Sequence, residues 1–156
     1  MREVLTRNPG ETDKDFFTRA AAVIAEYRKM GNEAAADACF SDIFPELYPI
    51  IVEMVECESA RNRLDDETEN EYYDRVMLLV PKIFHKYNNP EFTDEKYNDE
   101  QFKIKTFLKT RTRHCIREAV AKRLGITTWD AKYLLEIRRA RMSIAKRKKL
   151  TRVKFL

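Results

Sequence analysis

FKIKTFLKTRTRHCIREAVAKRLGI, residues 102–126, mixes apolar and cationic side chains and contains a single acid, Glu118. The apolar side chains recur at helical spacing, which predicts a long amphipathic helix over about residues 100–124. The side expected to face a core comprises Phe102, Phe107, Cys115, Ile116, Ala119 and Val120. Much of the remaining surface is cationic: Lys103, Lys105, Lys109, Arg111, Arg113 and Arg117. Such a face is either solvated surface or a contact with nucleic acid, whose phosphates these cations would neutralise.

Three more helices are predicted upstream of this segment, over residues 11–31, 32–59 and 68–87. Pro45 and Pro49 are expected to bend the second helix or to split it in two, because proline removes a backbone donor and clashes with the preceding turn. The chain contains 3 Gly and 5 Pro, and no segment alternates in the manner of a β-strand. We therefore predict an all-α fold, a bundle of about five helices.

The fifth helix is predicted to follow Gly125, over residues 127–150, with Thr128 as its N-cap. Residues 118–141 then match a helix-turn-helix, in which the glycine takes a positive φ at the turn. Trp129, Lys132 and Tyr133 would lie early on the recognition helix, with Arg138 farther along the same helix. An ordinary junction of two helices at a glycine produces the same pattern, so both interpretations stay open.

Charge divides the chain into two parts, which we expect to pack as one domain. Residues 1–100 contain 12 Lys and Arg against 23 Asp and Glu, whereas residues 101–156 contain 18 Lys and Arg against 3 acids. The two balances, −11 and +15, give the overall charge of +4. This asymmetry indicates a basic surface for a polyanion and an acidic surface for another partner. The alternative is that the two parts neutralise one another inside the fold.

Other features narrow the class of protein. No stretch approaches the roughly 18 apolar residues of a membrane span, and the N-terminus has no apolar signal core. Cys39, Cys57 and Cys115 are odd in number and widely spaced, which favours reduced thiols and a cytoplasmic location. His85 and His114 are the only histidines and have no patterned partner. We expect no enzymatic activity, no metal site and no cofactor, because no catalytic or phosphate-cradling motif is present.

Three segments, taken together, resemble bacterial RNA polymerase sigma factors of the sigma-70 superfamily. FKIKTFLKTRTRHCIREAVA resembles the family's promoter-melting and −10-reading helix, typically F-K-F-S-T-Y-A-x-W-W-I-R-x-A-I-x-x-A-I-A. EYYDRVMLLVPKIFHKYNN, residues 71–89, is similar to the helix that docks on the polymerase clamp. GNEAAADACFSDIFPELYPIIVEMV, residues 31–55, is similar in pattern to the family's opening helix. The segments occur in family order over about residues 31–121.

The resemblance implies binding to RNA polymerase core and to promoter DNA. It implies that His114 and Arg117 read the −10 element, that Lys103, Lys105 and Arg113 contact phosphates, and that Phe102, Ile104 and Phe107 help to capture flipped bases. Glu71, Asp74 and Arg75 fall on the clamp-binding helix. The complete predicted DNA-binding set is Phe102, Lys103, Lys105, Phe107, Lys109, Arg111, Arg113, His114, Arg117, Lys132 and Arg138.

The sequence also departs from the family pattern. Thr110 and Arg111 replace the tryptophan pair that opens the duplex, and Pro81 interrupts the clamp helix, which lacks its glycines. No clear separate −35-binding domain is expected. Either residues 118–141 stand in for that domain, or a second subunit supplies it, or the chain is a truncated or divergent factor that only binds. Two alternatives to a sigma-like factor remain: a stand-alone helix-turn-helix regulator of the phage or mobile-element type, and an interaction module whose basic end meets an acidic partner.

Overall fold

The chain folds into helices, and the predicted all-α class is confirmed. The computed structural model describes residues 2–92 and 103–155, with side chains described as far as Lys148, and no strand occurs within these ranges. The elements are α1 (Asp13–Lys29), α2 (Glu33–Arg61), α3 (Asp66–Ile83), the 3-10 turn η1 (Phe84–Lys86), α4 (Ile104–Arg111), α5 (Arg113–Leu124) and α6 (Thr128–Phe155). None of the helices in these ranges combines the length and apolar character needed to cross a membrane.

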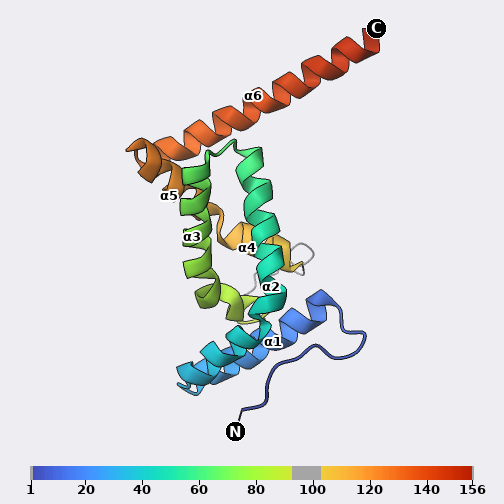
Figure 1. Cartoon of the computed structure of the whole chain (residues 1–156), viewed down its shortest axis with the longest axis vertical. Coiled ribbons are helices and arrows are strands. Elements are labelled where there is room, and N and C mark those ends of the chain that lie inside the picture. Colours follow the sequence, from blue (N-terminus) through green and yellow to red (C-terminus); the bar gives the residue numbers. More distant parts are fainter. Residues whose placement is uncertain (1, 93–102, 156) are drawn as a thin grey trace.

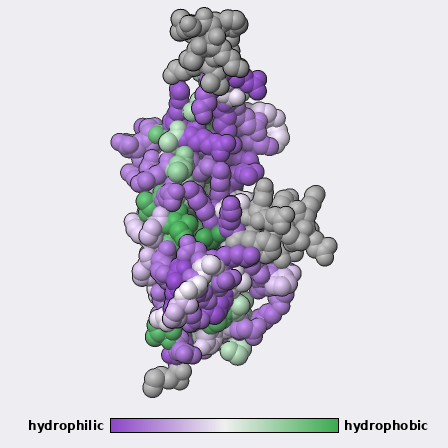
Figure 2. All heavy atoms as spheres, turned by 90° about the vertical axis from the view of Figure 1, so that its right-hand side faces the viewer, coloured by the Kyte–Doolittle hydropathy of each residue, from purple (hydrophilic) through white to green (hydrophobic). Residues whose placement is uncertain are grey.

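The helices form an upright body with a long rod across one end (Figure 1). The long segment of α2 and α3 stand side by side, α1 crosses the base, and α6 crosses the top and extends beyond the body. Its 28 residues correspond to about 42 Å of helix. Hydrophilic residues cover most of the face drawn in Figure 2, with smaller hydrophobic patches near its middle.

A glycine and an asparagine cap form the junction of the first two helices. Gly31, at φ 74°, lies just beyond α1 in the left-handed region that glycine tolerates. Asn32 then caps α2, its side-chain oxygen accepting from the Ala35 amide at 3.2 Å. Pro45 and Pro49 lie inside α2, which is continuous by its backbone geometry but changes direction between the part beside α1 and the part beside α3 (Figure 1). The prolines therefore bend this helix without splitting it.

An aromatic cluster around Phe84 holds the lower half together. The Phe84 ring meets Phe17 of α1 edge-on at 6.1 Å and Phe40 of α2 at 5.8 Å between centroids. Tyr87 stacks on Phe84 at 6.4 Å and lies 5.3 Å from Phe107 of α4. Edge-to-face and offset pairs at these distances add to the free energy of burial. The residues after α3 thus form the centre of the core, where α1, α2 and α4 meet.

The single helix predicted over residues 100–124 is wrong, because the chain breaks at Thr112. This residue is fully buried, and its hydroxyl donates to the Leu108 carbonyl at 2.6 Å, where its own amide also donates at 2.9 Å. Its φ of −109° and ψ of 9° are not helical, and α5 starts at the next residue. A threonine that bonds the preceding turn competes with regular helix geometry. The cationic segment therefore consists of two helices with different directions.

The C-terminal end of α3 is closed by an arginine from α1. Arg28 donates to the Pro81 carbonyl at 2.8 Å and to the Lys82 carbonyl at 3.2 Å. It also lies 2.7 Å from Nδ1 of His85, and because a guanidinium only donates, the ring nitrogen accepts. Partial burial, then Arg28 and Lys86, lower the pKa of His85 below its usual value near 6.5. The proline predicted to interrupt this helix lies in its last turn, so α3 ends two residues after it, and Arg28 satisfies carbonyls of that helix end.

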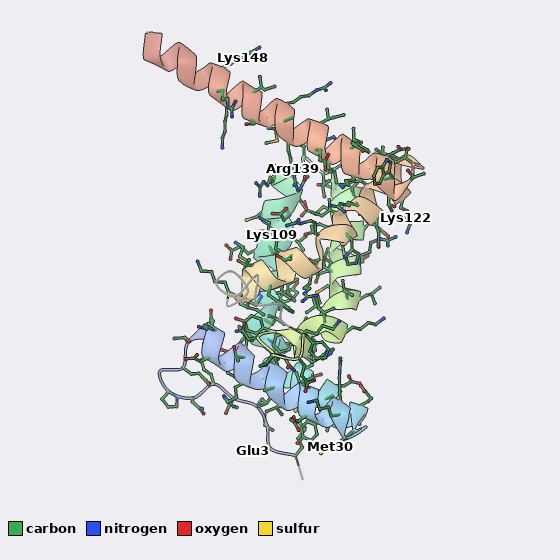
Figure 3. All side chains as sticks on the ribbon, turned by 180° about the vertical axis from the view of Figure 1, so that it is seen from behind. Glu3, Met30, Lys109, Lys122, Arg139 and Lys148 are labelled. Atoms are coloured by element: carbon green, nitrogen blue, oxygen red, sulfur yellow. The ribbon has the colours of Figure 1, made fainter. Side chains whose placement is uncertain are left out.

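A buried carboxylate joins the upper half. Glu58 of α2, with 7% of its side chain exposed, lies 3.0 Å from Lys109 of α4 and 3.8 Å from Arg139 of α6. Arg139 also donates to the buried Asn62 side chain at 3.0 Å, and Asn62 donates to the Glu58 carbonyl at 2.7 Å. Figure 3 places Lys109 and Arg139 beside the upper part of α2. One acid therefore fastens both α4 and α6 to α2.

We expect Glu58→Ala to lower the free energy of unfolding by about 1–3 kcal/mol, because it removes the carboxylate that pairs with Lys109 and Arg139 in a partly buried site and leaves Arg139 only its bond to Asn62. Urea denaturation followed by circular dichroism measures this loss. Glu53→Ala is the matched control on the same helix, since the Glu53–Lys105 pair at 3.0 Å is exposed and such pairs contribute little. Equal midpoints for the two variants would contradict the role given to Glu58.

We expect stability to fall as the pH drops through 6.5. The folded-state pKa of His85 is lowered, so the unfolded chain binds the proton at higher pH, and the stabilisation present above 6.5 is lost below it. Urea midpoints measured between pH 5.5 and 7.5 should decline in the natural protein and in His114→Gln. In His85→Gln the decline should flatten. Since the chain has 2 histidines, an unchanged slope in His85→Gln would exclude this source of pH dependence.

Candidate nucleic-acid interface

The junction of α5 and α6 has the geometry of a helix-turn-helix. The two helices are separated by residues 125–127, and Gly125 adopts φ 65° and ψ 34°. The Ile126 amide bonds the Ala121 carbonyl at 3.1 Å, which closes α5 through a left-handed cap. The N-cap of α6 is Thr127, whose hydroxyl accepts from the Asp130 amide at 3.1 Å, and not Thr128 as predicted. A three-residue turn containing glycine is typical of this motif.

Packing of the motif follows the predicted positions with one shift. Ala131 is fully buried against α5, so a small side chain does permit close approach of the two helices. The helix-turn-helix pattern predicts Leu124 and Leu134 as packing positions, but the structure buries Leu135, leaves Leu134 partly buried and leaves Leu124 half exposed.

An exposed groove lies where these two helices meet. It has a volume of about 280 Å³ and is lined by His114 and Arg117 of α5, Trp129 and Lys132 of α6, and Glu118 and Thr128. Trp129 is 62% exposed, contacts Tyr133 edge-on at 5.3 Å, and has the Lys132 ammonium 5.5 Å from its ring centre. Glu118 faces Arg75 at 2.6 Å, so its charge is already paired. The groove thus presents an aromatic face and unpaired cations together.

The other predicted DNA-binding residues are divided by the helix break. Phe107 is 2% exposed and belongs to the core, so its ring offers no face to a base in this structure. Lys105 pairs with Glu53, and Lys109 with Glu58, both of α2. Arg111 lies over the Phe107 ring at 5.8 Å. Lys103 and Arg113 are exposed and make no ion pair within the described residues, whereas Phe102 lies outside them.

Arg113 faces a different surface from His114 and Arg117, although all three lie on α5. Arg113 lines a pocket with Glu58, Lys109 and Arg139, whereas His114 and Arg117 line the groove against α6. On the single helix that the sequence predicts, these cations would belong to one cationic surface. In the structure they belong to two surfaces.

Part of the charge asymmetry is neutralised inside the fold. Besides the two pairs with α2, the end of α5 faces the start of α3: Lys122 lies 3.2 Å from Glu71, and Arg123 lies 2.8 Å from Glu67. The acidic and basic parts of the chain therefore pack directly against each other, as the neutralisation alternative expected for some of their charges. Arg117 and Lys132 of the groove, by contrast, make no ion pair with a described residue.

The predicted polymerase-binding residues also differ in their surroundings. Glu71 and Arg75 pair with each other at 3.0 Å, and each also pairs with α5. Asp74 is exposed on the outer side of α3 and makes no ion pair within the described part of the chain. Leu78, one turn farther on, is 72% exposed and was not selected from the sequence. Its position on the polar side of an otherwise amphipathic helix was a signal that helical spacing could have revealed.

Lys132 and Arg138 both lie on α6, but only Lys132 lines the groove. Arg61, Arg63, Arg139 and Lys146 were not selected from the sequence, and they line a second hollow under α6. No periodic signal brings them together, because Arg61 ends α2, Arg63 lies in the α2–α3 turn, and the other two lie on a helix that crosses it. Only the tertiary contact places them side by side.

The neighbouring cysteine and histidine do not form an activated pair. Burial raises the pKa of the Cys115 thiol to about 11, so the thiol stays protonated near neutral pH. Its sulfur lies 3.9 Å from the His114 ring, too far for a strong hydrogen bond. Within residues 2–92 and 103–148, no group of three or more His, Cys, Asp or Glu side chains is arranged to hold a metal ion.

Comparison with known proteins adds no relative to this description. No protein-family model, no curated protein and no solved structure matches the chain. The interpretation of the groove therefore rests on its own geometry and charge.

Proposed function

We propose that the protein is a sigma-like transcription initiation factor that binds promoter DNA through the groove between α5 and α6 and RNA polymerase core through the outer side of α3. The observation that carries this proposal is the meeting of His114 and Arg117 with Trp129 and Lys132 across a helix-turn-helix. His114 and Arg117 are expected to contact DNA from the resemblance to sigma factors. Trp129 and Lys132 are expected to do so from the helix-turn-helix pattern.

The groove has the chemistry that DNA recognition requires. Arginine and lysine bind phosphates or guanine edges, and histidine and arginine side chains at the start of a helix reach a groove of the duplex. An exposed tryptophan offers a stacking face for an unpaired base, an interaction of about 1–3 kcal/mol. Trp129 therefore supports contact with an opened strand as well as with a duplex. In the sigma family this role belongs to the tryptophan pair, which Thr110 and Arg111 replace in this chain.

Arg117→Ala combined with Lys132→Ala should weaken binding to a short DNA duplex and make the dependence of log affinity on log salt less steep by about 2, one unit per lost phosphate contact. Trp129 is the single tryptophan and lies in the groove, so its fluorescence should report DNA binding directly. Titrations at several salt concentrations measure both quantities.

The control variant removes two positive charges from a different part of the molecule. Lys14→Ala combined with Lys29→Ala changes two cations of α1, at the opposite end of the molecule from the α5–α6 junction. This variant should keep the natural salt slope. Equal losses in both double variants would mean that DNA responds only to net charge, and unchanged binding in the groove variant would overturn the proposal.

The polymerase contact is supported by the outer side of α3. Asp74 and Leu78 lie one turn apart, a carboxylate and an exposed apolar side chain on the same helix face. Protein interfaces place apolar side chains at the centre and polar side chains at the rim, and Leu78 with Asp74 beside it fits that layout. Glu71 and Arg75 support this face by holding α3 to α5, which is a positioning role.

Leu78→Asp should abolish capture of bacterial core RNA polymerase in a pull-down, because it places a charge at the centre of the proposed contact. Val4→Asp is the matched control, since Val4 is a comparably exposed apolar side chain on the N-terminal segment. Neither change touches an ion pair of the fold. Capture that survives Leu78→Asp would remove α3 as the docking surface.

A stand-alone helix-turn-helix regulator is the second candidate, favoured by the geometry of the Gly125 turn. It predicts binding to a duplex by the protein alone, usually as a dimer on a palindrome. Failure of the natural protein to bind polymerase, together with tight duplex binding, would favour this candidate.

A further inference from the structure

The underside of α6 covers a second basic surface, separate from the groove. A hollow of about 410 Å³ lies between α6 and the end of α2, and its charged lining consists of Arg61, Arg63, Arg139 and Lys146. No acid lines it within the described residues. Met142 and Ala145 of α6 supply an apolar wall. A concave site of this volume is in the range of small-molecule pockets.

A smaller pocket adjoins this hollow and shares two of its cations. It has a volume of about 210 Å³ and is lined by Arg61 and Arg139 together with Lys109, Arg113 and Glu58. Six cations from α2, the α2–α3 turn, α4, α5 and α6 thus surround the combined space, and Glu58 is the one acid among its described lining residues. Cations converging from several elements form a three-dimensional cradle, unlike a row of lysines on one helix face.

The acids near the cradle are already bound. Glu58 accepts Lys109 at 3.0 Å and has 7% of its side chain exposed, so little of its charge faces the hollow. Asp65, in the same turn as Arg63, accepts from the Thr68 amide at 2.8 Å and lies 3.7 Å from Arg123. Arg63 and Lys146 make no ion pair with any described residue, and Arg61 approaches Glu58 only at 3.9 Å. The cradle therefore retains a net positive charge without an internal partner.

We propose that this cradle binds the phosphates of a compact polyphosphate ligand, with several phosphoryl groups held between α2 and α6. Guanidinium groups suit this ligand, because their planar forks bind phosphate oxygens through paired, charge-assisted hydrogen bonds. A polyphosphate is favoured over a single phosphate because the cations are distributed along the hollow and the adjoining pocket. A ligand here bridges α6 to the body, next to Glu58 and Arg139, and so stabilises the docked position of α6.

The test is calorimetric titration of the full chain with inorganic tripolyphosphate at physiological salt. Arg61→Gln combined with Lys146→Gln should weaken binding at least about tenfold, because each change removes a charge-assisted contact. Lys146 makes no ion pair with a described residue and Arg61 approaches Glu58 only at 3.9 Å, so the bonds of Glu58 to Lys109 and of Arg139 to Asn62 stay in place, and circular dichroism checks that the helices remain. No binding by the natural protein, or equal binding by the double variant, would overturn the proposal.

The groove variant, Arg117→Ala with Lys132→Ala, is the control of equal charge. It should keep its affinity for tripolyphosphate while losing DNA affinity, and the cradle variant should do the reverse. Because each variant should lose only one of the two ligands, the experiment distinguishes a wrong polyphosphate site from a wrong DNA-binding site. Equal loss of tripolyphosphate binding in both variants would mean that the ligand follows net charge, and would contradict a built site.

Two further ligands distinguish the source of the phosphates. A nucleoside triphosphate that binds more tightly than tripolyphosphate and is displaced by it supports the cradle with Met142 and Ala145 as the wall for the base. A short single-stranded oligonucleotide that binds the cradle more tightly than either would overturn the compact ligand in favour of a nucleic-acid strand.

Discussion

The carboxylate of Glu58 is the interaction on which the upper half of the molecule depends. It lies in the interior of a helical body and holds Lys109 of α4 and Arg139 of α6 at the same time. Apart from this point, α6 packs chiefly on α5, and its distal part extends past the body (Figure 1). Removing a buried charge's partners costs far more than an exposed pair contributes. The direction of α6 therefore depends on its packing against α5 and on the attachment of Arg139 to Glu58 and Asn62 of the α2 end.

The break at Thr112 has an equally large consequence. A continuous helix would have directed Lys109, Arg113 and Arg117 along one face, which is how the sequence arranges them. In the structure Arg113 lines the Glu58 pocket together with Lys109 of α4, whereas His114 and Arg117, on the same helix as Arg113, meet Trp129 and Lys132. One cationic stretch thus contributes to two separate surfaces. Their separation is what allows variants of equal charge to distinguish them.

Charge has two functions in this protein. Ion pairs between α3 and α5, and between α2 and α4, attach the basic part of the chain to the acidic part. Arg117 and Lys132 at the junction of α5 and α6, and Arg63 and Lys146 on the underside of α6, make no ion pair with a described residue. In our proposal these remaining cations meet DNA and a polyphosphate. The outer side of α3, with Asp74 and Leu78, remains for a protein partner.

The sequence alone determined the all-α class, the approximate helix positions, the turn at Gly125 and the core side chains of α3 and α5, because helical spacing and glycine or proline conformations are local properties. It did not reveal the break at Thr112, since a buried threonine and an exposed one look alike in a sequence. Nor did it separate structural cations such as Lys109 from free ones such as Arg117, because the acids that pair with them lie far away in the chain. Only the tertiary structure decided which charges meet, since a charge acquires its role from the neighbours that packing provides.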